Sequence, residues 1–596
     1  MFKPLVGLKN VLLRTAPLLL LVINPLALCQ EKEKPLSADE EHQNLFSENR
    51  FPSANTCATC HPQHFREWSV SPHAYSQMSP VFNAFHGTLL VATNGTNGDF
   101  CIRCHTPVGM NLGEPEFISN MDRHPTSREG VTCIVCHRIN KSYGKLSGRL
   151  AIVEGDLFDP VFGPKGNDEL KRVIESGDYN VNTTRGKAGR AIHTKVEKFF
   201  QLDKSGVCGT CHDVNLVNGF RLEEAFSEFK HTPAAKSGVS CQDCHMGKEP
   251  GVDGGYSTGP AAIVGEKPTA DRKITNHMFI GPDYSIIHPG IFPHNVSASE
   301  LATIREWLTY DWEAGWGTDA FEENVPKDFK FPERWESADD RYDARDIIAD
   351  NQALLEEANK DRLKILQAAY KPGKIKVKNG RSGIKIDVEV RNGTDGHGVP
   401  TGFDAERIIF LQVYVYDSND KVVFKSGDLD PNGDVRDSHS LYVHNGELPL
   451  DKQLFSLQSR FLVRMVRGGD REQVLVINYS NDPLIFLRPS TSPTVLTGRP
   501  GGARKHKKGI EPLGHRWANY KIKRKDLTGN GPYRAEIRMI AGMIPVNLIH
   551  DIKGVGFDYF MSEREVAEAV VKGHQVLWEK KINIDSASGG GVWVEY

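Results

Sequence analysis

Helical periodicity is clearest in the middle of the chain. Between residues 340 and 370, apolar side chains recur three or four positions apart, which predicts a long helix. Pro372 and Gly373 follow directly and are expected to end it. A shorter repeat predicts another helix over 297–316, with Ser297 or Ser299 as its N-cap. We expect these segments to form a helical bridge, residues 291–373, between two halves of different character.

Beyond residue 374 the hydrophobic period changes to two. The stretch 384–391 alternates between apolar and polar side chains, which is the pattern of a half-buried strand. Further predicted strands span 409–416, 421–425, 461–466, 472–479, 483–488, 516–524, 533–540 and 575–583, and a short helix at 562–572 interrupts them. The segment 374–596 is therefore predicted to be an antiparallel β-sandwich of roughly eight strands.

Residues 51–290 show little periodicity of either kind. Gly, Pro, Asn and Asp interrupt the chain throughout, for example at 163–166. Such a segment buries too little side-chain surface to form an ordinary core, so we expect bound groups to supply one and folding to depend on them. The fold class is predicted as α+β, with a loop-rich, mainly α N-terminal domain.

Five copies of Cys-x-x-Cys-His lie in this segment and contain ten of the eleven cysteines. The copies are Cys57–Cys60–His61, Cys101–Cys104–His105, Cys133–Cys136–His137, Cys208–Cys211–His212 and Cys241–Cys244–His245. This is the attachment motif of c-type haem, in which both thiols form thioethers and the imidazole binds iron. Structural zinc usually takes two such cysteine pairs per ion, and five pairs do not divide evenly. Redox disulfides would need a thioredoxin-like pattern, which we do not find. We predict five covalent haems c that fill the N-terminal domain.

Each haem iron needs a sixth ligand or an open face. The five motif histidines leave seventeen of the 22 histidines as candidates. The distal candidates chosen from position are His73, His124, His193 and His277, with His86 and His231 in reserve and Met110 and Met246 as alternatives. Methionine ligation raises the potential of a haem. The supply of histidine therefore predicts mostly low-potential, six-coordinate haems.

Spacing also predicts which haems pack together. The motif histidines His105 and His137 are 32 residues apart, and His212 and His245 are 33 apart. These short intervals predict two closely packed haem pairs.

The N-terminus predicts export. A basic start is followed by a mostly apolar run at 16–28, too short for a comfortable membrane span, which is typical of a secretory signal over residues 1–29. Cys29 ends a near-lipobox, so a lipid anchor there is the alternative to ordinary cleavage. Residues 30–50 are expected to be a spacer. Since haem c is attached outside the bacterial cytoplasmic membrane, the signal and the motifs predict a periplasmic or outer-surface protein.

Charge narrows the range of partners. The chain has 73 basic and 76 acidic side chains, and the haem propionates make the holoprotein more acidic. This balance argues against nucleic acid and against a polybasic membrane patch. The expected partners are redox proteins that donate and accept electrons.

The surroundings of the motifs resemble a known family. Trp68, the stretch Ser71-Pro72-His73-Ala74 and the residues flanking the second, third and fifth motifs resemble multihaem cytochromes related to cytochrome c-554 and hydroxylamine oxidoreductase, over about residues 51–280. The resemblance implies stacked haem pairs, bis-histidine ligation, periplasmic electron transfer and His73 as a distal ligand. All five motifs end in histidine, unlike the Cys-x-x-Cys-Lys motif of pentahaem nitrite reductases, and the tyrosine cross-link of hydroxylamine oxidoreductase cannot be placed.

One loop of the second half stands out. Glycines on both sides of His397, in the stretch 392–402, allow a tight loop whose imidazole either points into another domain or lies in solvent. The loop resembles a Gly-His-x-x-Pro-Thr-Gly element in β domains of related multihaem proteins, which implies that His397 caps a haem.

Three functions remain open from the sequence. The favoured one is electron transfer through five haems, with the β domain used for docking. The second is an enzyme with one open haem that acts on a small nitrogen or sulfur compound. The third is a structural or adhesive role for the β domain.

Overall fold

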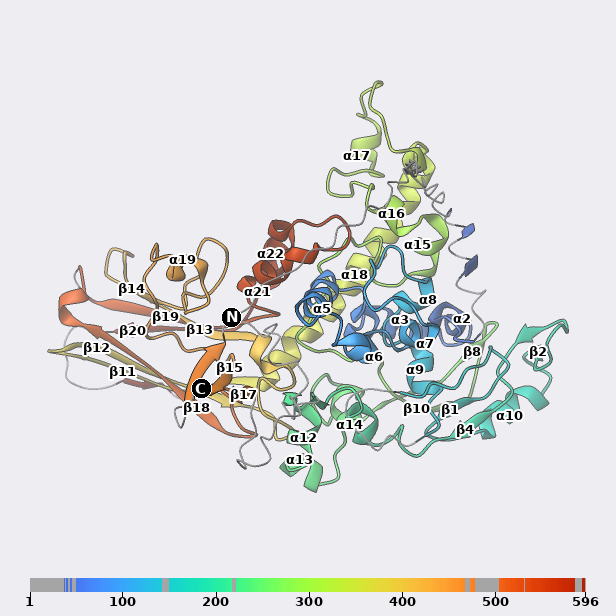
Figure 1. Ribbon diagram of the computed structural model, residues 1–596, viewed down its shortest axis with the longest axis horizontal. Coiled ribbons are helices and arrows are strands. Elements are labelled where there is room, and N and C mark those ends of the chain that lie inside the picture. The colour runs from blue at the N-terminus through green and yellow to red at the C-terminus, as the bar shows by residue number, and fades with distance from the viewer. Residues whose placement is uncertain are drawn as a thin grey trace, which may run out of the picture. The chain divides into compact units, whose positions relative to one another are not determined.

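The fold is described from a computed structural model (Figure 1). It describes residues 50–141, 150–216, 221–466, 472–477, 503–529, 531–584 and 592–594, with residues 37, 39, 40, 43 and 44 before them. In this part of the chain, no helix is both long enough and apolar enough to cross a bilayer.

Short capped helices make up the first part of the motif-bearing half. They are α2 Ala54–Ala58, α3 Pro62–Ser69, α4 Pro72–Tyr75, α5 Pro80–Ala92, α6 Ile102–His105, α7 Pro107–Leu112, α8 Pro125–Arg128 and α9 Cys133–His137. Several begin with a hydroxyl N-cap followed by proline, as at Ser71-Pro72 and Ser79-Pro80. The hydroxyl accepts a bond from a free backbone N–H, and proline suits the first helical position. The sequence thus contains many helix N-termini, but few of these helices are long.

The second part mixes helices with two-stranded sheets. The helices are α10 Asp168–Glu175, α11 Ser205–Cys208, α12 Ala225–Phe229, α13 Pro233–Lys236 and α14 Cys241–His245. The paired strands are β1 Val161–Gly163 with β4 Val196–Lys198, β2 Val181–Asn182 with β3 Arg190–Ala191, β5 Val214–Asn215 with β6 Arg221–Glu223, β7 Ser257–Pro260 with β10 Asp271–Ile274, and β8 Ile263–Val264 with β9 Lys267–Pro268. The sequence missed these strands because two to four residues are too few to show a period.

The bridge differs from its prediction in one place. The single helix predicted at 297–316 is wrong: α15 Val296–Leu301 ends, and α16 Ile304–Trp307 begins again after an extended Ala302. The reason is a capping box in which Thr303 and Glu306 satisfy each other's backbone N–H groups, which starts a new helix. The long helix is confirmed as α18 Ala338–Ala369, and α17 Asp319–Glu322 precedes it.

Antiparallel strands dominate the second half, as predicted. One sheet has the order β18-β12-β11-β21, from His515–Lys523, Gly383–Asn392, Tyr370–Gly380 and Val592–Val594. A second has the order β14-β13-β19-β20, from Val422–Ser426, Ile408–Tyr416, Tyr533–Gly542 and Gln575–Ile584. A third has the order β16-β15-β17, from Glu472–Ile477, Arg460–Val466 and Ala503–His506. The strand predicted at 483–488 lies outside the described residues.

The two four-stranded sheets share one apolar core. Ile386 and Val388 of β12, Leu411 of β13 and Ile537 of β19 are fully buried members of a single cluster. Strand β11 begins at Tyr370, directly after α18, and carries Pro372 and Gly373 at a register shift. The predicted helix stop is therefore a helix-to-strand junction.

Helices near the C-terminus pack on the motif-bearing half. They are α21 Val546–Ile552 and α22 Glu563–Lys572, the second of which confirms the helix predicted at 562–572, while α19 Leu441–His444 follows β14 in the β half. Val81 and Ala84 of α5 share an apolar cluster with Leu548 of α21 and Val566 of α22. Segments almost 500 residues apart in sequence thus form one cluster. Figure 1 shows α5 beside α21 and α22, in agreement with these contacts.

Candidate haem sites

The five motifs define sites 1 to 5, numbered in chain order. Each motif forms one helical turn, and the histidine N–H bonds the carbonyl of the first cysteine, at 2.8 Å for His61 and for His212. Positions i, i+3 and i+4 of a helical turn lie on the same face. The turn therefore presents both thiols and the imidazole on one side, as attachment to one porphyrin requires.

Four of the five motif imidazoles are held by backbone carbonyls. Nδ1 lies 2.7 Å from Ala261 O in His61, 3.0 Å from Ser76 O in His105 and 2.8 Å from Phe162 O in His137. His245 bonds the backbone of Ile280. Since a carbonyl oxygen only accepts, Nδ1 carries the proton and Nε2 keeps its lone pair for a metal. Burial also lowers the pKa of these four imidazoles, to about 4 for His61 and His245.

His212 is held differently. Its Nδ1 lies 3.0 Å from Oε1 of the Glu223 carboxylate. Burial alone would lower the pKa of His212, but the bond and charge of Glu223 outweigh it and raise the pKa to about 9. Site 4 therefore has the most electron-rich imidazole of the five.

Two motif imidazoles face a second imidazole at the separation that an iron needs. A pair that binds one iron from opposite sides has ring centroids roughly 6 Å apart, since each metal–nitrogen bond is about 2 Å and each ring adds about 1 Å. His73 and His212 have centroids 6.1 Å apart, and His245 and His397 have centroids 6.3 Å apart. Their ring planes differ by 39° and 13°, respectively.

Centroid distance alone does not identify a ligand pair. His61 and His64 are also 6.2 Å apart, but they are close neighbours in the sequence at the start of α3. His73 and His212, like His245 and His397, come from separate elements far apart in the sequence. Only pairs of this kind can close over a porphyrin from both sides.

The loop that carries His397 is built rigidly. The amide of the buried Asn392 donates to the carbonyls of His397 at 2.8 Å and Ile510 at 3.0 Å. Nδ1 of His397 is 2.9 Å from the carbonyl of Gly398, which leaves Nε2 for a metal. The Thr401 hydroxyl donates to Glu228 of α12 at 2.6 Å. The loop therefore places an imidazole of the β half beside site 5, not in solvent.

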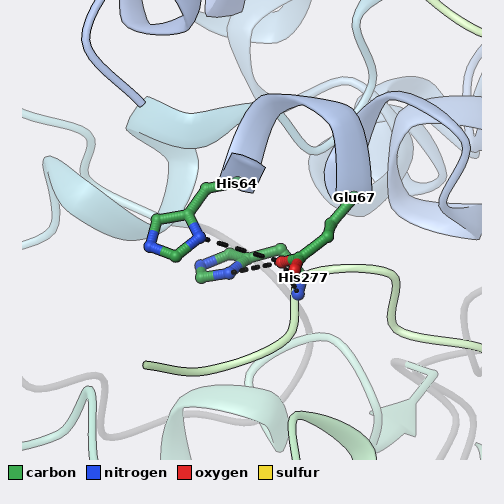
Figure 2. Close-up of side chains that lie close together, drawn as sticks. All are labelled: His64, Glu67 and His277. Atoms are coloured by element: carbon green, nitrogen blue, oxygen red, sulfur yellow. Dashed lines mark hydrogen bonds and ion pairs between the residues drawn. The ribbon is translucent and has the colours of Figure 1, made fainter. Parts of the chain in front are cut away.

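His277 lies in a cluster with His64 and Glu67, which Figure 2 shows. One carboxylate oxygen of Glu67 accepts the backbone N–H of His277 at 2.9 Å and lies 3.7 Å from Nδ1 of His64 and 3.8 Å from Nδ1 of His277. Nδ1 of His277 is closer, at 2.9 Å, to the carbonyl of Thr275. Glu67 thus orients His277, whose Nε2 is the atom available to a metal.

Electrostatic proximity connects the remaining distal candidates to particular sites. After burial, proximity to His64 and His137 lowers the pKa of His277, to about 3. Likewise, burial and then His61 lower the pKa of His193 to about 4, and Nδ1 of His193 is buried without a partner among the described residues. His277 therefore lies near His64 and site 3, and His193 near the histidines of sites 1 and 3.

Each of several other histidines has one ring nitrogen within hydrogen-bonding distance of a backbone group. His124 caps α8, and its Nδ1 accepts the N–H of Thr126 at 3.2 Å. Nε2 of His86 is 2.8 Å from the carbonyl of Glu116. His288 and His294, which sequence reasoning did not single out, also have Nε2 near carbonyls, those of Tyr310 and Ala74. The reserve His231 lies exposed at the surface.

Site 2 has a different neighbourhood. The Phe82 ring stacks on His105 with centroids 3.6 Å apart and planes 4° apart. Among the described residues, no histidine ring lies across from His105 at the separation seen at sites 4 and 5. Met110 lies on α7, just after this motif, and Met246 is the C-cap of α14.

Contacts between thiols show which sites adjoin. The thiol of Cys57 (site 1) lies within hydrogen-bonding reach of that of Cys133 (site 3), as Cys104 (site 2) does of Cys211 (site 4) and Cys208 (site 4) of Cys241 (site 5). These contacts and burial raise the pKa of Cys133, Cys208 and Cys211. A thiol of site 4 thus lies beside one of site 5, whereas thiols of sites 2 and 3 lie beside those of sites 4 and 1. The pairing of the haems themselves stays a prediction.

Glu129 joins the helices of sites 1 and 3. Its carboxylate accepts the N–H of Ala54 at 2.9 Å, the Thr132 hydroxyl at 2.6 Å and the Ser53 hydroxyl, next to the N-termini of α2 and α9. Burial raises the pKa of this carboxyl to about 7, although the three bonds oppose the shift. One buried side chain therefore fixes the approach of two motifs.

These features fit covalently attached haem. Ten cysteines stand as free thiols in pairs on helical turns, each beside an imidazole with Nε2 available. Two of those imidazoles face a second imidazole at the separation of an iron site, and none of the ten forms a disulfide. The donor set suits iron in porphyrin, whose chemistry when bound is one-electron transfer.

Comparison with known proteins agrees with this description. Residues 56–138 match the family described as Cytochrome c554 and c-prime. A penta-heme cytochrome c552 from Thermochromatium tepidum aligns at 17% sequence identity with a TM-score of 0.47, covering 90% of this chain and 99% of that chain. A search of curated proteins found no match. The family match over residues 56–138 and the five motifs support a multihaem c-type cytochrome.

Proposed function

We propose that this protein is an exported electron carrier with five covalent haems c, working between redox partner proteins outside the cytoplasmic membrane. The observation that carries the proposal is the pair of facing imidazoles at 6.1 and 6.3 Å at sites 4 and 5. Two imidazoles close both faces of an iron, which leaves electron transfer as the chemistry such a site performs. Export follows from the predicted signal over residues 1–29, with a lipid anchor at Cys29 as the alternative.

The distal ligands follow from the same geometry. His73 serves site 4 and His397 serves site 5, by ring separation. His277 serves site 3 and His193 serves site 1, by their electrostatic proximity to His137 and His61. Bis-histidine ligation at these four sites gives low potentials, because none of the four irons receives a methionine sulfur.

The adjoining thiols support a continuous route for electrons. Sites 2 and 5 both adjoin site 4, and sites 1 and 3 adjoin each other. Cys136 of site 3 is close enough to Cys208 and Cys211 of site 4 to affect both thiols electrostatically. Site 4 is thus the junction through which the other sites communicate, and the β half, which supplies His397, completes the array.

EPR spectroscopy of the purified ferric protein tests the proposal. Intact mass and haem content establish the number of haems, and spectra are recorded with and without nitrite or hydroxylamine. We expect four or five low-spin haems. The haems at sites 1, 3, 4 and 5 are expected to respond to neither nitrite nor hydroxylamine. Fewer than five haems, or high-spin iron at site 4 or 5, would contradict the proposal. Loss of one low-spin signal in His73→Ala and of another in His397→Ala assigns the two sites.

A second function is favoured by one observation at site 2. Its imidazole, His105, stacks on Phe82 and has no facing histidine in the described chain. An iron there with an open face would bind a small nitrogen or sulfur compound and exchange electrons with site 4, whose Cys211 contacts Cys104. The protein would then be an enzyme whose other haems deliver or remove electrons.

His86 provides the test for site 2, because it is the reserve ligand that lies near His105. If site 2 is open, the ferric protein shows one high-spin signal that nitrite or hydroxylamine shifts, and His86→Ala leaves the spectrum unchanged. If His86 binds the iron, the unmodified protein is entirely low-spin and His86→Ala creates the high-spin signal.

A further inference from the structure

Site 4 differs from the other sites in the group that holds its motif histidine. Nδ1 of His212 faces a carboxylate, Oε1 of Glu223, at 3.0 Å. At sites 1, 2 and 3 the corresponding nitrogen bonds a neutral backbone carbonyl, and His245 of site 5 lies beside the neutral backbone of Ile280. The five motif histidines thus have two kinds of hydrogen-bond partner, and the charged one is the carboxylate at site 4.

The position of Glu223 is fixed by its surroundings. The residue ends β6 and pairs with Val214 of β5, which begins two residues after His212. Above the carboxylate lies Gly402 of the His397 loop, at φ +72°, where an added Cβ would be 3.2 Å from Oε1. A loop from the β half therefore closes over the carboxylate, whose side chain is 21% exposed.

Among the described residues, no lysine or arginine forms an ion pair with Glu223. Arg407 is the cation close enough to interact with Glu223 electrostatically. Both guanidinium nitrogens of Arg407 instead bond the carboxylate of Asp283. The hydrogen bond to His212 is the direct contact of the Glu223 carboxylate with a motif histidine, and its charge also acts at longer range on His105 of site 2.

We propose that Glu223 makes site 4 the haem of lowest potential in this protein, an inference that rests on the proposed function. An imidazole hydrogen-bonded to a carboxylate is a more basic ligand than one bonded to a carbonyl. A more basic ligand, and a nearby negative charge, both favour ferric over ferrous iron, since the ferric centre carries one more positive charge. Glu223 is thus a positioning and tuning residue, not an iron ligand.

The place of site 4 gives this tuning a consequence. Site 4 adjoins sites 2 and 5 through its two cysteines and lies close to site 3. The junction of the array is then the last haem to be reduced. Electrons fill the outer haems first, and passage between the two sides of the array crosses an uphill step at the centre.

EPR-monitored redox titration of the full-length holoprotein tests the inference. The unchanged protein is expected to show one low-spin haem, lost in His73→Ala, that is reduced after all the others. In Glu223→Gln, which keeps the size and an accepting oxygen but removes the charge, this midpoint rises. Each tenfold loss of preference for the ferric state corresponds to about 59 mV for a one-electron couple. Glu223→Asp, which keeps the charge, is expected to retain the low midpoint.

The controls separate this inference from the proposed function. Glu175→Gln removes an exposed carboxylate of α10, paired with Lys171 at 3.7 Å, and is expected to change no midpoint. If Glu223→Gln holds five haems with unchanged midpoint potentials, the inference about Glu223 is overturned, and the proposed function as an electron carrier still stands. A site 4 haem that is reduced before others in the unchanged protein would overturn it without any variant. Missing haems would instead contradict the proposed function.

Discussion

At the scale of single residues, Glu129 shows how a carboxyl buried between sites 1 and 3 makes stability depend on pH. Its carboxyl is fully enclosed and has a pKa of about 7, against an ordinary value of 4.5. Between these pH values the unfolded chain has released a proton that the folded chain still holds. The unfolding free energy therefore falls as pH rises from 4.5 to 7, by about 3 kcal/mol at 1.36 kcal/mol per unit, and stays level above that range.

Glu129→Gln is expected to remove this slope, because an amide does not ionise: its oxygen accepts from Ala54 N–H and the Thr132 hydroxyl, and its NH2 group donates to the Ser53 hydroxyl. Denaturant unfolding at pH 5 and pH 7.5, followed by haem absorbance, measures the difference. Glu356→Gln is the matched control, since Glu356 is an exposed carboxylate of α18 paired with Lys360. Equal slopes in Glu129→Gln and the unchanged protein would show that Glu129 is ionised in the fold.

At the scale of elements, the loop at 392–402 depends on one buried amide. Asn392→Ala removes the donors to the carbonyls of His397 and Ile510 and the acceptor for Thr394 N–H. Unsatisfied buried groups of this kind cost about 1–3 kcal/mol each. We expect lower stability together with partial conversion of one haem to high spin, because His397 loses its fixed position. EPR spectra and denaturant unfolding measure the two effects.

Asn379→Ala is the control for this loop. Asn379 is a buried amide of β11, away from His397, that accepts a bond from Arg524 at 2.6 Å. Its replacement is expected to lower stability without changing any spin state. A spin change of the same size in both variants would mean that general loosening, and not loop position, controls the iron.

The elements also show where sequence reasoning works. Strands such as β12 and β13 were predictable because every second side chain enters the apolar core, which imposes a period of two. Helix α18 was predictable from its long repeat, whereas the break at Thr303 depends on a capping box inside a continuous apolar pattern. The five motifs are local and could be identified outright. The facing pairs could not, since His73 follows the first motif in sequence but lies against His212 of the fourth.

At the scale of the whole molecule, α18 connects the two halves through side-chain hydrogen bonds along its length. Asn351 donates to the carbonyl of Pro289 in the segment that precedes the bridge. Further along, Arg362 donates to the carbonyl of Pro282 at 2.8 Å and to that of Gly573 at 2.9 Å. Gln367 donates to the carbonyl of Leu577 in β20. The helix thus binds the haem-bearing half and the β half to one frame, which keeps His397 at site 5.

Arg362→Met tests this connection, because methionine keeps much of the apolar length but leaves two carbonyls without a donor. We expect a loss of about 2–6 kcal/mol, from two unsatisfied acceptors at about 1–3 kcal/mol each. Tryptophan fluorescence and haem absorbance, which should change together in the unchanged protein, are expected to separate into two transitions. Lys364→Met is the control, since Lys364 is 62% exposed on the same helix and pairs only with Asp361 among the described residues. Coincident transitions in Arg362→Met would mean that shared apolar contacts, such as those between α5 and α21, suffice to couple the halves.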